Sequence, residues 1–413
     1  MSITLDNIEY KNKQIPIIFD HYKKLPIFNL QLVFKNQGYI NDKNLSGLTN
    51  ISTKILNEGT LKDGAISFAT KLENNAIEIH TSIGLETVVM EISCLKDQYK
   101  KAIKYTTALL KDPNISQDSL DKIKNLTLSK LAQKENDFDF IASSNLKSAI
   151  YKNTPLQNNY LGKIEDINKI TINDVKTRLN EILNINNLIV VSGGDINKDE
   201  LQKDLKKIFK HLNSKDINNE IKKIDIIKNP QSITVKKETE QSYIYFASPL
   251  DIDYNSKDTY KVKVASFILG SSGFGSRLME EIRVKNGLAY SVYGYFTYKK
   301  SHSNFTGYLQ TELKNTKKAQ DMVIKIINEF IKDGVTKEEL DSAKLFLNGS
   351  EPLRVETFSQ RLNRAFNLYY KDLPFDYSKK ELELIDNLSL DDLNSFILKH
   401  DEIKRLTFSI VTK

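Results

Sequence analysis

The sequence predicts an α+β fold built by tandem duplication of two similar domains, each an antiparallel sheet with helices packed on one face. Three observations predict this fold class. The chain has 413 residues, more than a single hydrophobic core usually organises. Two pairs of similar segments recur at nearly the same spacing. Each half also combines alternating strand patterns with long amphipathic helical patterns.

The internal repeat rests on two independent pairs of segments. KDPNISQDSLDKIK (111–124) resembles KDGVTKEELDSAK (332–344), and INKITINDV (167–175) resembles IDNLSLDDL (385–393). Both pairs are separated by about 220 residues and occur in the same order along the chain. Two agreeing spacings arise by chance much less often than one similar helix start, so we infer repeated units of roughly 200 residues.

Each half opens with strand-like runs, such as IFNLQLVFK (27–35) in the first and SYIYFAS (242–248) in the second. Further alternating runs and long amphipathic stretches follow in both halves. Thr336 and Glu339 have the spacing of a capping box, which predicts a helix start at that point. An antiparallel sheet with helices on one face is the arrangement that this order favours.

The segment 212–230 is polar, rich in Asn and Lys, and ends in Pro, which is typical of a linker. The sequence therefore predicts an N-terminal domain at 1–215, a linker at 216–230 and a C-terminal domain at 231–413.

The composition is that of an ordinary globular protein, with 40% hydrophobic and 27% charged residues. The net charge of +7 is mild and the lysines are interleaved with acids, so we expect no nucleic-acid partner. No stretch reaches the roughly 18 apolar residues of a membrane span. Without a signal-peptide pattern we expect a cytoplasmic protein, or a periplasmic one if this is a mature form. Cys94, in an apolar alternating run, is expected to be a buried core thiol.

Two motifs carry a family resemblance. GLTNISTKILNEGT (47–60) lies early in the chain, and GSSGFGSRLMEEIRVKNGLAYSVY (270–293) opens its second half. With the twin α+β organisation, they make the chain similar to the insulinase/pitrilysin-like zinc peptidases. The closer similarity is to the half-length branch that includes the mitochondrial processing peptidase. The resemblance covers essentially the whole chain.

In that family the first motif carries His-x-x-Glu-His, in which two His bind Zn²⁺ and the Glu activates the metal-bound water. The resemblance places these three positions on Asn50, Thr53 and Lys54. The family's third ligand, a Glu on a later helix, falls near Ser129 or Lys130. None of these side chains suits zinc, so we expect a core helix and no metal or cofactor in this chain.

Histidines elsewhere do not offer a replacement site. None of the five has a second His three or four residues away, as a zinc-binding helix face requires. They are His21, His80, His211, His302 and His400.

The second motif keeps features expected of a working site. Arg283 lies in the last turn of a predicted helix that ends at Asn286–Gly287, and Tyr290 follows where a strand should begin. The chain reversal lets both side chains point toward one place. In the family this Arg and Tyr pair hydrogen-bonds the substrate backbone near the scissile carbonyl. The alternative is that Arg283 pairs with Glu280 and that Tyr290 is a half-buried strand aromatic.

Gly270, Gly273 and Gly275 precede this helix. They follow a helical pattern rather than a strand and lack a following Lys-Ser/Thr, so a phosphate-binding loop is not expected. A tight turn near the Arg/Tyr pair is the predicted role of these glycines.

The resemblance implies a non-metal subunit of a heterodimeric zinc metalloendopeptidase, inactive alone. A homologous partner would supply His-x-x-Glu-His and the zinc, and unfolded peptides would be the substrates. A homodimer could form without that partner. The alternative from another class is a catalytically silent structural or peptide-binding protein of the same fold.

Overall fold

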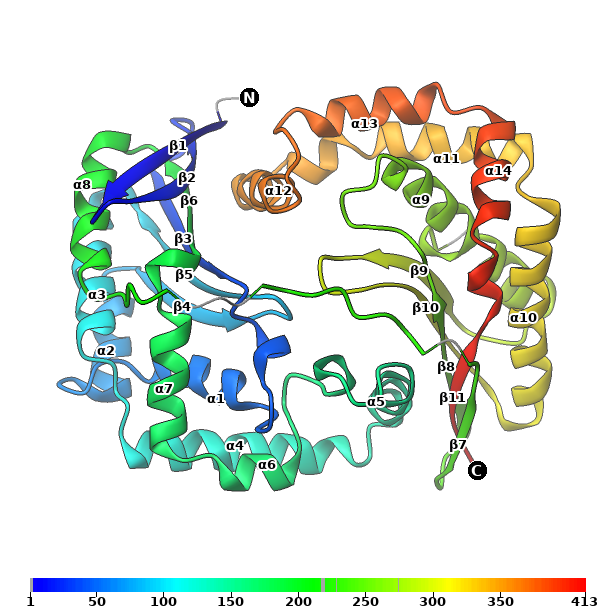
Figure 1. Ribbon diagram of the computed structural model, residues 1–413, viewed down its shortest axis with the longest axis horizontal. Helices are drawn as coiled ribbons and strands as arrows, with labels where there is room; N and C mark the ends of the chain where they lie inside the picture. The colour runs from blue at the N-terminus through cyan, green and yellow to red at the C-terminus, as the bar shows by residue number, and fades with distance from the viewer. Residues whose placement is uncertain (1–2, 217–219, 228, 274) are drawn as a thin grey trace. The chain divides into compact units, whose positions relative to one another are not determined.

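The structure is a computed structural model that describes residues 3–216, 220–227, 229–273 and 275–413 (Figure 1). The chain forms two compact units, each built around one sheet, which confirms the α+β class. Unit 1 comprises Met1–Ala132, Asn158–Ile221 and Val355–Asn367. Unit 2 comprises Gln133–Gln157, Lys222–Arg354 and Leu368–Lys413. The predicted linker includes 217–219 and 228, which lie outside the described residues.

Unit 1 contains a six-stranded sheet in the order β1-β2-β6-β3-β5-β4. All neighbours are antiparallel except β2 and β6, which run parallel; the long segment between them, which contains β3, β4, β5 and several helices, allows this crossover. The strands are β1 Ile3–Tyr10, β2 Lys13–His21, β3 Ile27–Lys35, β4 Glu78–Ile83, β5 Thr87–Leu95 and β6 Leu188–Gly194. Cys94 on β5 is buried as expected, and burial raises the pKa of its thiol to about 12.

Helices cover both faces of this sheet. Tyr99 of α3 packs edge-on against Phe28 of β3, at 4.8 Å between ring centroids. Gln31, three residues along β3 and so on the opposite face, bonds Asn363 of α12 at 3.0 Å. The α-helices that lie wholly or partly in unit 1 are α1 Leu48–Ile55, α2 Gly64–Glu73, α3 Tyr99–Lys111, α4 Gln117–Lys134, α6 Ile164–Lys169, α7 Ile172–Ile182, α8 Lys198–Phe209 and α12 Phe358–Tyr370.

Unit 2 contains a five-stranded sheet in the order β7-β11-β8-β10-β9, with β7 and β11 parallel and the other pairs antiparallel. The strands are β7 Ser232–Lys236, β8 Gln241–Pro249, β9 Val292–Tyr298, β10 Ser303–Glu312 and β11 Thr407–Thr412. The remaining helices are α5 Phe138–Ile150, α9 Thr259–Ser266, α10 Thr316–Asp333, α11 Lys337–Gly349, α13 Tyr377–Asp386 and α14 Leu390–Lys399. Two π-helical segments, Phe267–Ser271 and Met279–Lys285, interrupt the α-helical pattern.

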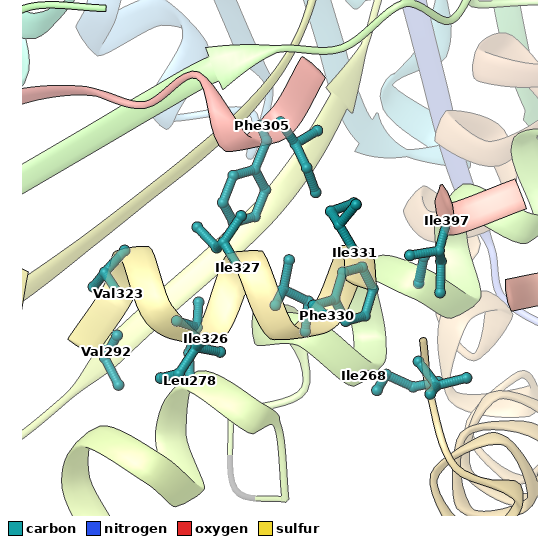
Figure 2. Packing of buried hydrophobic residues seen from close by; sticks show 14 of the residues in the cluster. Ile268, Leu278, Val292, Phe305, Val323, Ile326, Ile327, Phe330, Ile331 and Ile397 are labelled. Carbon is teal, nitrogen blue, oxygen red and sulfur yellow. The ribbon is translucent and has the colours of Figure 1, made fainter. Parts of the chain in front are cut away.

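The core of unit 2 forms on the apolar stripe of α10 (Figure 2). Val323, Ile326, Ile327 and Phe330 are each at most 2% exposed, and their spacing places them on one helix face. They pack with Phe305 of β10 and with neighbouring helices. The opposite face of the sheet is covered by α5, which packs on β8 and β11.

The two units therefore exchange one helix each. Phe138–Ile150 comes from the first half of the sequence and packs in unit 2. Phe358–Tyr370 comes from the second half, and most of it packs in unit 1. Both helices have 13 residues and lie at the spacing of the sequence repeat, so the exchange belongs to the duplication itself.

The repeated sequence segments mark helix starts. Thr336 and Glu339 form the expected capping box of α11, and Thr171 forms one with Asp174 at the start of α7. In the second half, the Ser389 side chain accepts a bond from the backbone N–H of Asp392 at the start of α14. The segments are alike because each must satisfy the free N–H groups of a first helical turn.

A buried polar network in unit 1 fixes the start of α1. Asp42 accepts bonds from the backbone N–H groups of Gly47 and Thr49 and from the Thr49 hydroxyl, at 3.0, 2.9 and 2.5 Å. Arg178 of α7, 3% exposed, donates to Thr49 Oγ1 at 2.9 Å and to both oxygens of Gln37. The charged groups are thus hydrogen-bonded throughout, as burial requires.

Replacing Arg178 should show how much this network contributes to the stability of the folded chain. We expect Arg178→Met to lower the free energy of unfolding by about 3–5 kcal/mol, because it removes the donor to buried Gln37 and Thr49 and the positive charge near buried Asp42. Urea denaturation would measure it. The exposed Lys176→Met on the same helix is the control and should change stability by less than about 0.5 kcal/mol. Equal effects of the two variants would contradict the prediction.

His302, partly buried beside β10, is held neutral by its surroundings. Its ring stands edge-on to Tyr151 at 5.7 Å, and Nδ1 shares a 2.9 Å hydrogen bond with Ser301. Burial, with Lys299 and Lys147 nearby, lowers the pKa of His302 from 6.5 to about 4.

This histidine should make unit 2 acid-sensitive. Between pH 6.5 and 4 the unfolded chain takes up a proton here that the folded chain resists, so stability falls as the pH falls. We expect His302→Asn to reduce the slope of unfolding free energy against pH by up to about 1.4 kcal/mol per pH unit in that window. The exposed His80→Asn serves as the comparison. An unchanged slope in His302→Asn would refute this assignment.

Candidate functional site

The helix α1 carries the three positions at which the family resemblance would place zinc chemistry. Asn50 and Thr53 are each 1% exposed. Thr53 donates its hydroxyl to the carbonyl of Thr49 at 2.6 Å, within its own helix. Asn50 Nδ2 is buried without a hydrogen-bond partner in the described part of the chain. These side chains behave as core positions of an ordinary helix.

Lys54, the third position, faces helix α4. Its Nζ lies 3.4 Å from Thr127 Oγ1. Burial, followed by the charge of Lys130, lowers the pKa of Lys54. The structure therefore places α4 beside α1, where the family resemblance would put a third zinc ligand. The charged residue that α4 brings there is Lys130, a second ammonium group. Lys130 lies 3.3 Å from the hydroxyl of Tyr160, and Ser129 is exposed.

A zinc ion does not fit this set of residues. An amide, a hydroxyl and two lysines offer no imidazole or carboxylate, and the ammonium groups would repel a dication. The acid that follows on the same segment, Glu58, is paired with Lys122 at 2.7 Å. Within residues 3–216, 220–227, 229–273 and 275–413, no three His, Cys, Asp or Glu side chains are grouped as metal ligands.

Arg283 and Tyr290 come together in unit 2. Arg283 lies on the π-helical segment Met279–Lys285, where an α-helix was expected. Gly287, at φ 59°, is the left-handed cap that the sequence predicts. The N–H of Gly287 bonds the Arg283 carbonyl at 3.0 Å, and that of Leu288 bonds Ile282 at 2.8 Å. This closure reverses the chain.

After the reversal, the Arg283 guanidinium carbon lies 5.1 Å from the centroid of the Tyr290 ring. Tyr290 is 82% exposed and precedes β9, which begins at Val292, later than the sequence suggested. It is therefore not a half-buried strand aromatic. A guanidinium over an aromatic ring is attracted to it, and the two side chains bring N–H and O–H groups, both hydrogen-bond donors, to one place.

The glycine-rich segment supports the packing beside this pair. Gly270 is buried, and a Cβ there would lie 2.7 Å from the backbone of Gly294 on β9. Gly273 and Gly275 have φ of 69° and 86°, which favours glycine. Phe274 lies outside the described residues. The close approach of Gly270 to Gly294 was not predicted, because nothing in the sequence links the two positions.

Known protein families match sequence segments from both units. A family model described as "Insulinase (Peptidase family M16)" matches residues 29–163, and "Peptidase M16 inactive domain" matches residues 169–347. A Helicobacter pylori protein named "Non-peptidase homolog YmxG" is 40% identical over 408 residues, which is 99% of this chain and 94% of that protein. A Bacillus subtilis protein named "Uncharacterized zinc protease YmxG" is 22% identical over 78% of this chain and 77% of its own length.

A solved structure supports the same fold. The crystal structure of a peptidase M16 inactive domain from Pseudomonas fluorescens superposes with a TM-score of 0.91 at 23% sequence identity, covering 100% of this chain and 98% of that one. The predicted resemblance is thereby confirmed, and this chain belongs to the insulinase (peptidase M16) family.

Proposed function

We propose that this chain is the non-metal subunit of a heterodimeric zinc endopeptidase. Its role is to present Arg283 and Tyr290 to the backbone carbonyl of a bound peptide. The observation that carries the proposal is the adjacency of the partly buried Arg283 to the exposed Tyr290, at 5.1 Å from guanidinium carbon to ring centroid. In the same chain, Asn50, Thr53 and Lys54 cannot bind zinc or activate water.

Arg283 and Tyr290 have the chemistry for this role. A guanidinium and a phenol both donate hydrogen bonds, and a carbonyl under attack develops negative charge on its oxygen. Donors placed in advance stabilise that charge without reorganising during the reaction. The capped chain reversal at Gly287 supplies this placement, because it fixes the backbone between the two residues.

The zinc would come from a homologous partner with His-x-x-Glu-His. The name of the Helicobacter pylori relative, a non-peptidase homologue, agrees with a chain that does not hydrolyse peptides by itself. The same name also favours a second candidate, a catalytically silent protein that binds peptides or has a structural role. A neighbouring reading frame with the intact motif would favour the protease subunit.

Co-purification with such a partner, followed by peptide cleavage assays of each chain alone and together, tests the proposal. Activity that appears only in the mixture supports it. A partner that cleaves equally well without this chain favours the silent protein instead.

We expect the purified chain to bind no stoichiometric zinc and to cleave no peptide by itself, because Lys54 and Lys130 place positive charge where the metal would bind. Metal analysis by mass spectrometry and a fluorogenic peptide assay would measure both. One zinc per chain, together with activity that a chelator removes, would overturn the expectation.

Within a reconstituted heterodimer, we expect Arg283→Gln or Tyr290→Phe to lower kcat/KM by at least about tenfold, because each removes a donor to the developing oxyanion. Thermal melting should show that both variants remain folded. Lys285→Gln on the same helical segment and Tyr295→Phe on β9 are matched controls that should retain turnover. If all four variants turn over alike, the Arg/Tyr pair has no role in cleavage.

A further inference from the structure

Unit 2 contains a cavity of about 270 Å³ that the proposed function does not use. It lies between α9, the π-helical segment Phe267–Ser271, β9, α11 and the 3₁₀ turn Pro352–Val355. None of these elements contributes Arg283 or Tyr290. The volume is just below the range of about 300–1,000 Å³ usual for small-molecule sites, so the cavity suits a ligand the size of one amino acid residue.

The charged side chains that line the cavity are both cationic. Lys263 and Arg354 line it, and no acidic side chain of the described residues does. Lys263 pairs with Glu381 at 2.5 Å, which fixes the ammonium group and leaves it further N–H donors. The exposed Arg354 side chain makes no hydrogen bond or ion pair within the described ranges. The unpaired guanidinium of Arg354 favours an anion here, and Lys263 adds N–H donors beyond the one that Glu381 accepts.

Hydroxyl groups supply further hydrogen-bonding capacity. Ser271 and Ser272 line the cavity, and Ser272 Oγ is buried without a partner among the described residues. Tyr298 also lines it, and burial raises the pKa of its phenol, so the phenol stays protonated. A buried hydroxyl without a partner is costly unless a ligand or water satisfies it.

Most of the remaining lining is apolar, and three of its side chains are phenylalanines. Phe267 and Phe346 pack with ring centroids 4.8 Å apart, and Phe296 of β9 contributes a third ring. Phe346 is 52% exposed, although a phenylalanine gains free energy when apolar surface covers it. The lining thus joins an apolar surface to a cationic one within one cavity.

We propose that this cavity binds a carboxylate carried on an aromatic or aliphatic group. Arg354 and Lys263 hold the carboxylate, and Phe267 and Phe346 cover the apolar group. The C-terminal residue of a peptide and a free aromatic acid share this chemistry. Inorganic phosphate lacks the apolar group that the phenylalanines would cover. The site is independent of the Arg/Tyr pair and of any zinc-bearing partner.

The test uses the full chain alone, without a partner or a cleavage assay. The probe is a dye-labelled hexapeptide that ends in phenylalanine, with either a free C-terminal carboxylate or a C-terminal amide. Fluorescence anisotropy should show at least tenfold tighter binding of the free acid. Competition by N-acetylphenylalanine separates the two sources. If low concentrations of N-acetylphenylalanine displace the acid probe, a free acid suffices as the ligand. If they displace it only weakly, the ligand is the C-terminal end of a peptide. Either result supports the site.

Variants tie the binding to the cavity. We expect Arg354→Gln to weaken binding of the acid probe at least tenfold, and Phe346→Ser to weaken binding of both probes. Lys314→Gln removes an exposed charge elsewhere in unit 2 and should leave affinity unchanged; circular dichroism confirms that each variant is folded. Four results would overturn the proposal: equal binding of acid and amide, no binding of either, Arg354→Gln matching Lys314→Gln, or displacement of the acid probe by low concentrations of inorganic phosphate.

Discussion

The hydrogen bonds that join Thr49 to the buried charges Asp42 and Arg178 hold the start of α1 in place, and the rest of that part of unit 1 depends on them. They fix the start of α1 from two directions, through the backbone N–H groups and through the Thr49 hydroxyl. Burying a carboxylate and a guanidinium is costly, so the network persists only because nearly every donor and acceptor is matched. The helix therefore has a scaffold that does not rely on a metal ion. Its ligand positions could change without loss of the fold.

The two units differ in how they combine inherited structure and chemistry. Unit 1 keeps the helix and the neighbouring α4, but Lys54 and Lys130 give this place a positive charge. Unit 2 keeps the chain reversal that brings Arg283 to Tyr290. Both outcomes follow from local geometry. A helix packed on apolar residues tolerates new side chains at its polar positions, whereas a capped reversal needs glycine at φ 59°.

Much of the fold could be predicted because its signals are local. The capping box of Thr336 and Glu339, the cap at Gly287 and the alternating strands each depend on a few neighbouring residues. The internal repeat also predicted that the two halves have similar folds. Features that depend on distant residues could not be predicted, and they include the approach of Gly270 to Gly294, the cavity between Lys263 and Arg354, and the parallel pairing of β2 with β6. The π-helical geometry of Met279–Lys285 also escaped prediction, since its hydrophobic pattern resembles that of an α-helix.

The helix exchange between the halves has a consequence for biosynthesis. Asp20 on β2 is fully buried, and its charge is met at 2.8 Å by Arg361, a residue 341 positions later in the chain. Until this late part of the chain is made, the Asp20 carboxylate lacks its ion-pair partner, and α12 cannot cover its face of the N-terminal sheet. Contacts of such long sequence separation form late and slowly. Maturation of the first sheet must wait for translation of nearly the whole message, which couples the two ancestral modules into one folding unit.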